Sequence, residues 1–159
     1  MNETYQDFLI RSWEKRDSTS VNSLIAKVLA EYGLDWDPID TDRDVVEVET
    51  FYQQTGGEFW LVEAQGKVVG SAGYYPISRG NKAVEIRKMY LLPEVRGKGL
   101  GQFLLNRLES AIAQQNYQEI WIETATVLKE AIKLYEKNGY QLLEDVETSR
   151  CDRAYIKFL

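Results

Sequence analysis

Three glycines at alternate positions, Gly97, Gly99 and Gly101, form the part of the sequence whose residue types most directly indicate chemistry. Glycine has no Cβ, so the backbone can approach a ligand closely there and adopt turns that other residues avoid. Apolar residues at helical spacing follow the first glycines, namely Leu100, Phe103, Leu104, Leu108, Ala111 and Ile112. Amides at a helix start are unpaired and lie at the positive end of the helix dipole. Together with the positive charges of Arg96 and Lys98, they predict a phosphate or pyrophosphate site.

Histidine is absent from the sequence and cysteine occurs once, as Cys151. These counts exclude a histidine-based catalytic triad and a histidine base, and they argue against a zinc site, so no metal is expected. A catalytic base in this chain must therefore be a carboxylate, a tyrosine, a lysine or an ordered water molecule.

The elements that position the glycine turn follow from the spacing of apolar residues. Strands are predicted at residues 8–13, 58–64, 67–75, 83–92, 119–126, 141–145 and 153–159. Helices are predicted at residues 18–32, 42–54, 100–115 and 128–138. Pro93 ends the central strand because proline donates no ladder hydrogen bond, and Gly70 and Gly73 are candidates for β-bulges. The order predicts one α/β domain over residues 1–159, with a mixed, mostly antiparallel central sheet flanked by helices.

Composition and charge restrict the setting of the protein. The 159 residues carry a net charge of −6, which argues against non-specific binding to nucleic acid. The sequence has no apolar run long enough to span a membrane and no basic-then-apolar leader, so neither a membrane partner nor secretion is expected. A single cysteine allows no intramolecular disulfide, which favours a reducing, cytoplasmic location.

Two segments carry a family resemblance. The glycine turn fits neither the triphosphate loop G-x-x-x-x-G-K-[ST] nor the dinucleotide fingerprint G-x-G-x-x-G. Residues 96–101 do fit R-x-x-G-x-G after a strand ending in Leu-Leu-Pro-Glu, and this resembles the acyl-CoA-binding motif of the GCN5-related N-acetyltransferase (GNAT) family. Residues 131–140, Ala-Ile-Lys-Leu-Tyr-Glu-Lys-Asn-Gly-Tyr, resemble that family's A-x-x-L-Y-E-K-x-G-F segment. The resemblance extends over essentially the whole chain.

The resemblance implies acetyl-CoA as the acyl-donor cosubstrate. Its pantetheine arm would lie against the central strand and pair with backbone groups of Met89 and Leu91, on either side of Tyr90, as an added strand pairs with a sheet edge. The pyrophosphate would be bound by the turn, formed by Arg96, Gly97, Lys98, Gly99, Leu100, Gly101 and Gln102. The side chains of Arg96 and Lys98 are expected to contribute less than the amides.

The resemblance also implies catalytic roles. Tyr135 matches the family tyrosine that protonates the leaving thiolate, although a core-facing aromatic residue fits the same spacing. Glu85 and Glu123 stand on neighbouring strands where different family members carry a catalytic glutamate; a structural carboxylate is the alternative for each. We favour Glu85 narrowly, and we expect Arg87, two residues away on the same strand face, to lower its pKa.

Two positions depart from the family or lie outside its motifs. Leu128 stands where many members carry a cofactor-contacting asparagine, and leucine cannot make that hydrogen bond. Cys151 is expected near the last turn, away from both motifs, with no acyl-carrying role.

The acceptor pocket, by resemblance, would be formed by the first two helices, their loop and the last strands. Its expected residues are acidic or aromatic: Asp35, Trp36, Asp37, Asp40, Asp42, Phe51, Tyr52, Tyr74 and Tyr75. Such a pocket would suit a cationic amine, and a solvated acidic loop is the alternative.

These observations predict an N-acetyltransferase in which a deprotonated primary amine attacks the thioester directly in a ternary complex. The amine would belong to a small molecule or to a protein. A non-catalytic acyl-CoA-binding regulatory module and a phosphate-binding domain for another nucleotide are the alternatives. The sequence leaves open whether the chain forms a homodimer.

Overall fold

The computed structural model describes residues 1–143 and 150–159. Its strands are β1 (Asn2–Tyr5), β2 (Phe8–Ser12), β3 (Glu58–Ala64), β4 (Lys67–Ile77), β5 (Ala83–Leu91), β6 (Glu119–Thr124), β7 (Gln141–Leu143) and β8 (Arg153–Phe158). Its α-helices are α1 (Ser18–Glu31), α2 (Arg43–Val46), α3 (Leu100–Gln114) and α4 (Lys129–Lys137). Short helical turns occupy η1 (Lys15–Asp17), η2 (Glu49–Gln53) and η3 (Pro93–Val95).

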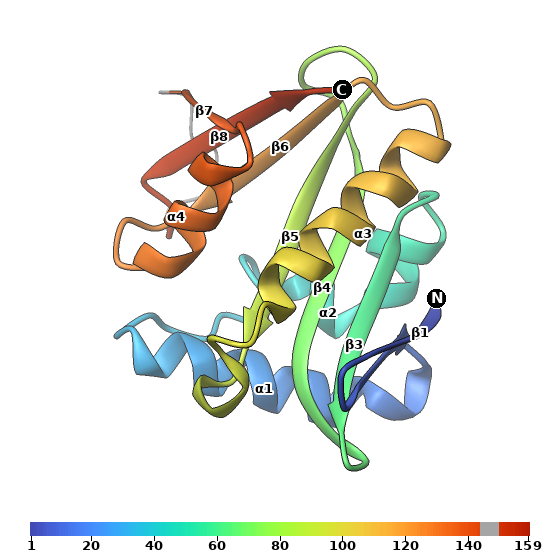
Figure 1. Ribbon diagram of the computed structural model, residues 1–159, viewed down its shortest axis with the longest axis vertical. Coiled ribbons are helices and arrows are strands. Elements are labelled where there is room, and N and C mark those ends of the chain that lie inside the picture. Colours follow the sequence, from blue (N-terminus) through green and yellow to red (C-terminus); the bar gives the residue numbers. More distant parts are fainter. Residues whose placement is uncertain (144–149) are drawn as a thin grey trace.

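In the described part of the chain the strands form one mixed sheet in the order β1-β2-β3-β4-β5-β6-β8-β7. Only the β5–β6 pair is parallel among the described strands, and the other pairs are antiparallel. Figure 1 shows α3 in front of the sheet, α1 and α2 behind it, and α4 beside β6 and β8. The expected mixed, mostly antiparallel sheet with flanking helices is confirmed.

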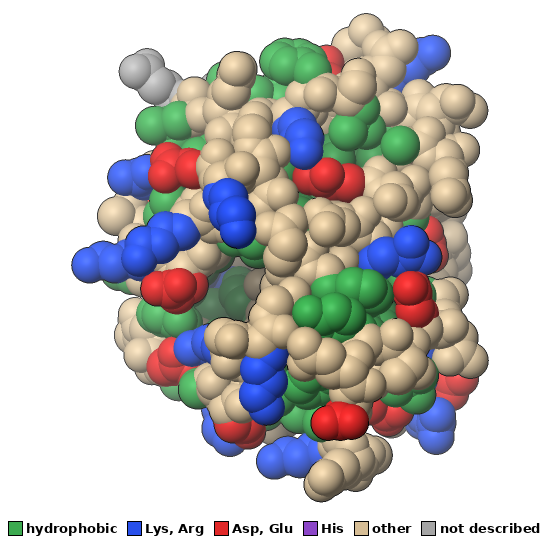
Figure 2. All heavy atoms as spheres, in the orientation of Figure 1, with side chains coloured by type: hydrophobic (Ala, Val, Ile, Leu, Met, Phe, Trp, Pro, Cys, Tyr) green, Lys and Arg blue, Asp and Glu red, His purple; other side chains and the backbone are tan. Residues whose placement is uncertain are grey.

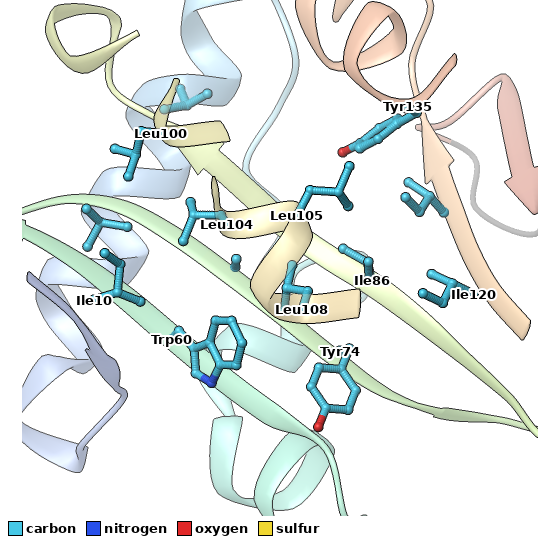
Figure 3. Close-up of a cluster of buried hydrophobic side chains, with 14 of the residues drawn as sticks. Ile10, Trp60, Tyr74, Ile86, Leu100, Leu104, Leu105, Leu108, Ile120 and Tyr135 are labelled. Carbon is cyan, nitrogen blue, oxygen red and sulfur yellow. The ribbon is translucent and has the colours of Figure 1, made fainter. Parts of the chain in front are cut away.

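Strand alternation divides the core into two layers. Successive side chains of a strand point to opposite faces, and β3 follows this rule: Phe59 and Leu61 join the cluster beneath α1 and α2, whereas Trp60 and Val62 join the cluster beneath α3. Figure 3 shows the second cluster, in which the leucines of α3 cover the sheet. Burying these aromatic and aliphatic side chains from both faces is the main force that holds the helices on the sheet.

Two elements differ from the prediction made from the sequence. Strand β1 was missed because the turn to β2 contains no glycine or asparagine; Gln6 itself takes the left-handed conformation, with φ of 53°. The helix expected at residues 42–54 is instead the short α2 and the turn η2. The predicted strand at residues 141–145 is seen as β7, and its last two residues lie outside the described residues.

Two irregularities of β5 shape the site. An extra residue interrupts the β4–β5 register between Ser71 and Gly73, and Lys88 takes a φ of 55° there. The Ser71 hydroxyl donates a hydrogen bond of 2.7 Å to the Lys88 carbonyl, which stabilises this bulge. In addition, β5 pairs with β6 only from Ala83 to Glu85. Beyond Glu85 the two strands separate, and the edge of β5 is left open (Figure 1).

Within the described residues, no helix is long and apolar enough to cross a membrane.

Candidate active site

A cavity of about 360 Å³ lies where β5 and β6 separate. Figure 2 shows the surface hollowed between α4 and the N-terminal end of α3, with charged side chains around the opening. The cavity collects predicted site residues that are far apart in the sequence: Glu85, Met89, Tyr90, Leu91, Arg96, Gly97, Gly99, Leu100, Gly101, Gln102, Glu123 and Tyr135. Of the predicted catalytic and cofactor-binding residues, only Lys98 is not among the lining residues.

The glycine turn presents a helix start to this cavity. After η3, Gly97 and Gly99 both have left-handed backbones, with φ of 76° and 80°. Gly99 is the N-cap of α3, and no side chain of the described residues caps the helix. The first amides of α3 therefore remain for a ligand, and Leu100, Gly101 and Gln102 line the cavity. A helix start with free amides is suited to a phosphate group.

The two basic side chains of the turn are held by the protein. Arg96 donates hydrogen bonds of 3.0 and 2.8 Å to the Leu91 carbonyl, and its guanidinium lies 2.6 Å from the Glu31 carboxylate. The Lys98 ammonium lies 5.8 Å from the centre of the Phe8 ring. The anion site thus depends on backbone amides more than on these charges. Because the Leu91 carbonyl already accepts hydrogen bonds from Arg96, the predicted pairing of Leu91 with the pantetheine arm depends on the Leu91 amide.

Tyr135 projects from α4 into the same space. Its side chain is 4% exposed and packs against the rings of Tyr140 and Tyr155 at 5.9 and 6.3 Å. Figure 3 shows the hydroxyl directed away from α4, toward the β5 side of the cluster. Burial, with smaller effects of Tyr90 and Cys151, raises the pKa of Tyr135 well above its ordinary value. Tyr135 therefore keeps its proton near neutral pH and can act as a proton donor.

Glu85 lies at the point where the strands begin to separate. It stands opposite Tyr75 of β4 and Trp121 of β6. Arg87 donates a 3.3 Å hydrogen bond to its carboxylate, as the shared strand face predicts. The charge of Arg87 does lower the pKa of Glu85, as expected, but burial has the larger effect and raises that pKa above its ordinary value. A raised pKa makes this carboxylate a better base than an exposed one.

Glu123 lies two residues beyond Trp121 on β6, and its side chain is also buried. Its carboxylate accepts a 2.8 Å hydrogen bond from Arg79, whose guanidinium lies 4.6 Å from the centre of the Trp121 ring. The two glutamates influence one another, since the charge of Glu123 contributes to the raised pKa of Glu85. The cavity thus contains two buried carboxylates, each bonded to an arginine.

The expected acidic acceptor pocket is corrected by the structure. Asp42 is fully buried and pairs with Lys88 at 3.2 Å and with Arg150. Asp44 pairs with Lys88 at 3.2 Å and with Arg87 at 3.2 Å, and it accepts a hydrogen bond from Tyr52. These carboxylates are neutralised inside the protein and do not form an acidic surface for an amine.

Other members of that expected set are structural as well. Tyr52 and Tyr74 are fully buried in the two core clusters. Asp37 accepts hydrogen bonds from the amides of residues 39–41 and so stabilises its own turn. Tyr75 is half-buried, with the Arg87 guanidinium 5.5 Å from its ring centre, and remains the aromatic residue of the set that lies beside Glu85.

Several lining residues were not predicted. Lys88, Arg150 and Thr41 line the cavity, and so does Cys151, which was predicted to lie away from both motifs. Their positions depend on the β5 bulge and on contacts between distant segments: Lys88 and Thr41 are 47 residues apart, and Arg150 and Asp42 are 108 residues apart. No local pattern of residues signals such contacts.

Among residues 1–143 and 150–159, no group of three or more histidine, cysteine, aspartate and glutamate side chains could hold a metal ion.

Comparison with known proteins gives consistent matches. The sequence profile of the acetyltransferase (GNAT) family matches residues 25–140. An uncharacterised N-acetyltransferase of Escherichia coli (strain K12), YjgM, is 34% identical over 142 residues, which cover 87% of this chain and 85% of that protein. The N-acetylaspartate synthetase of Danio rerio is 32% identical over 105 residues, covering 65% of this chain but only 37% of that protein.

Two solved structures share the fold. An acetyltransferase of the GNAT family from Staphylococcus aureus Mu50 superimposes with a TM-score of 0.87 at 20% identity, covering 95% of this chain and 98% of that one. The PaiA N-acetyltransferase of Thermoplasma acidophilum, solved in complex with coenzyme A, gives a TM-score of 0.73 at 18% identity, covering 96% and 99%.

Proposed function

Since this chain belongs to the acetyltransferase (GNAT) family and is an N-acetyltransferase, we propose that it moves an acetyl group from acetyl-CoA to a primary amine by direct attack in a ternary complex. The observation that carries the proposal is that one cavity joins an open strand edge, a helix start with free amides, a buried phenol and two buried carboxylates. Each of these groups has a separate task in such a transfer.

The residues at the donor end fit a CoA thioester. The open edge of β5 at Met89, Tyr90 and Leu91 offers backbone groups to an extended pantetheine arm. The amides after Gly97 and Gly99 offer donors to a diphosphate. Leu128 also lines the cavity and supplies an apolar contact at the position where many family members carry an asparagine.

The residues at the centre supply proton transfer. The acetyl thioester, when bound, provides an activated acyl group with a thiolate leaving group. Glu85 or Glu123 takes the proton of the acceptor ammonium, directly or through water. Tyr135 gives its proton to the departing sulfur, which prevents the reverse attack. Backbone donors near the β5 bulge stabilise the negative charge that develops on the carbonyl oxygen.

The acceptor is a primary amine of a small molecule or of a protein. The net charge of −6 supports a partner other than nucleic acid. A single cysteine supports a cytoplasmic location. The continuous sheet supports one acyl-CoA N-acyltransferase domain across residues 1–159.

Gly99→Ala is expected to weaken acetyl-CoA binding about 10-fold, because a left-handed backbone costs roughly 1–2 kcal/mol for a residue with a Cβ. The added Cβ would also lie 2.7 Å from the Tyr5 hydroxyl, so the turn would have to shift. Isothermal titration calorimetry with acetyl-CoA measures the change. Gly66→Ala is the matched control, because Gly66 has the similar φ of 76° but lies in the turn between β3 and β4, outside the cavity lining. Equal affinity of the Gly99 variant and the wild type would contradict the prediction.

Glu85→Gln is expected to lower kcat/KM for the amine on the order of 10-fold near neutral pH, below the usual range for an acid–base residue because Glu123 and water remain nearby. The reduction in kcat/KM should become smaller as the pH approaches the pKa of the amine, since an amine that is already deprotonated needs no base. The raised pKa of Glu85 predicts an acidic limb in the wild-type pH profile that the variant lacks. Glu123→Gln is the comparison variant. If Glu123→Gln loses the acidic limb of the pH profile and Glu85→Gln keeps it, Glu123 is the base.

The function is tested by release of CoA thiol from acetyl-CoA across a panel of primary amines. Amine-dependent release by the wild type is the expected result. Thermal stabilisation by acetyl-CoA, and not by ATP or NAD, would accompany it. Stabilisation by acetyl-CoA without thiol release for any amine would favour the regulatory module instead. In that case alanine at Glu85, Glu123 or Tyr135 would also leave acetyl-CoA binding unchanged.

A further inference from the structure

The N-terminal hairpin lies against the glycine turn, although the two segments are more than 90 residues apart in sequence. The Tyr5 hydroxyl donates a hydrogen bond of 3.2 Å to the Lys98 carbonyl. The Gln6 side-chain amide donates a second, of 3.0 Å, to the same oxygen. Gln6 reaches this position from the turn between β1 and β2, where its own φ is 53°. One carbonyl of the turn thus accepts two bonds from the hairpin.

The geometry of the peptide group gives these bonds a consequence for the ligand. The Lys98 carbonyl and the Gly99 amide belong to one planar trans peptide, since the described residues contain no cis peptide bond, so the two groups point in opposite directions. Gly99 lines the cavity, and Lys98 does not. Holding the carbonyl toward the hairpin therefore turns the Gly99 amide toward the other side, where the helix start faces the cavity.

Further contacts fasten the hairpin to α3. The Tyr5 ring stacks on Phe103 with centres 4.3 Å apart and planes 21° apart. Glu3 forms a 2.8 Å ion pair with Arg107, one turn further along the helix. A Cβ on Gly99 would lie 2.7 Å from the Tyr5 hydroxyl, so the hairpin also fills the space behind the turn. The hairpin and the helix start form one packed unit.

We propose that the β1–β2 hairpin is a positioning element for the donor substrate, in which Tyr5 and Gln6 fix the Lys98–Gly99 peptide so that its amide faces the diphosphate. The inference rests on the proposed function, because it needs an acyl donor that carries a diphosphate. Neither residue touches the donor. Both act through the orientation of a backbone group.

The test compares two acyl donors, acetyl-CoA and S-acetylpantetheine, which has the same thioester but no diphosphate. Tyr5→Phe keeps the ring on Phe103 and removes one hydrogen bond, Gln6→Ala removes the other, and the double variant removes both. Thr4→Ala, at an exposed position of the same strand, is the control. The double variant is expected to raise KM and Kd for acetyl-CoA on the order of 10-fold, with kcat unchanged, because two hydrogen bonds are lost. Its kcat/KM for S-acetylpantetheine should equal that of the wild type.

Three results would overturn the inference, and they are distinguishable. An unchanged Kd for acetyl-CoA in the double variant would show that the hairpin does not position the amide. An equal loss of kcat/KM with acetyl-CoA and with S-acetylpantetheine would show a general structural effect, which thermal denaturation would report independently. Absence of acetyl-CoA binding by the wild type would overturn the proposed function itself, before any variant is compared.

Discussion

Tyr135→Phe is expected to lower kcat by about 100-fold, the low end of the range for a general acid, while the protein remains folded. The ring remains and preserves the contacts with Tyr140 and Tyr155. The loss therefore falls on proton donation to the leaving sulfur, and KM for acetyl-CoA should change little.

Initial rates of thiol release at saturating acetyl-CoA and amine measure this prediction. Tyr140→Phe is a matched control, because Tyr140 is a buried neighbour whose hydroxyl donates a 3.0 Å hydrogen bond to Glu109 and which does not line the cavity. That variant should lose some stability and keep its kcat. If Tyr135→Phe retained kcat within about threefold, far less than a general acid contributes, Tyr135 would be only a core residue.

Asp42→Asn is expected to lower the free energy of unfolding by about 3 kcal/mol, because removing one partner of a buried ion pair leaves an uncompensated charge. Asp42 is fully buried, and both Lys88 and Arg150 face its carboxylate. Lys88 keeps Asp44 as a second partner, so we expect the lower end of the usual range. Asparagine preserves the volume of the side chain, so the lost free energy of unfolding comes from removal of the negative charge.

The same pair predicts a dependence on pH. Burial alone would raise the pKa of Asp42, but the hydrogen bonds from Arg150 and the charge of Lys88 outweigh burial and lower it. A carboxylate with a lowered pKa in the folded state stabilises the protein above its unfolded pKa, near pH ~4, and loses that effect as the pH falls through the folded value. The stability difference between wild type and Asp42→Asn should therefore narrow on acidification.

Chemical denaturation at several pH values measures both effects. Asp40→Asn is the matched control, because Asp40 is an exposed aspartate of the same loop. That variant should unfold like the wild type. If the two variants were equally stable, the buried pair would make no net contribution. Because Lys88 belongs to the β5 bulge and lines the cavity, a loosened Asp42 variant should also show a raised KM for the amine.

Most of the fold followed from local sequence. Strand β3 was predicted with its observed bounds, and α1, α3 and β5 were predicted within a residue or two at each end. These elements have strong apolar periodicity and clear terminators such as Gly33 and Pro93. The N-terminal hairpin and the region of α2 were not predicted, because their conformations depend on packing. Gln6 adopts a left-handed turn that its residue type does not favour, and the residues after Asp42 are held by the buried ions rather than by helical periodicity.

The sequence by itself determined the glycine turn and the free helix start that we propose bind the donor. Closely spaced glycines before a helix need only local geometry to present free amides, and a missing histidine excludes whole classes of catalysis wherever the chain folds. Tertiary structure decided the rest. Whether Glu85 has a raised or a lowered pKa depends on how much water the fold removes from it, and burial outweighed the neighbouring arginine. Whether Asp42 meets a substrate or a buried lysine depends on contacts with β5 and with residue 150. Such long-range contacts arise only when distant segments pack, so no local spacing of residues determines them.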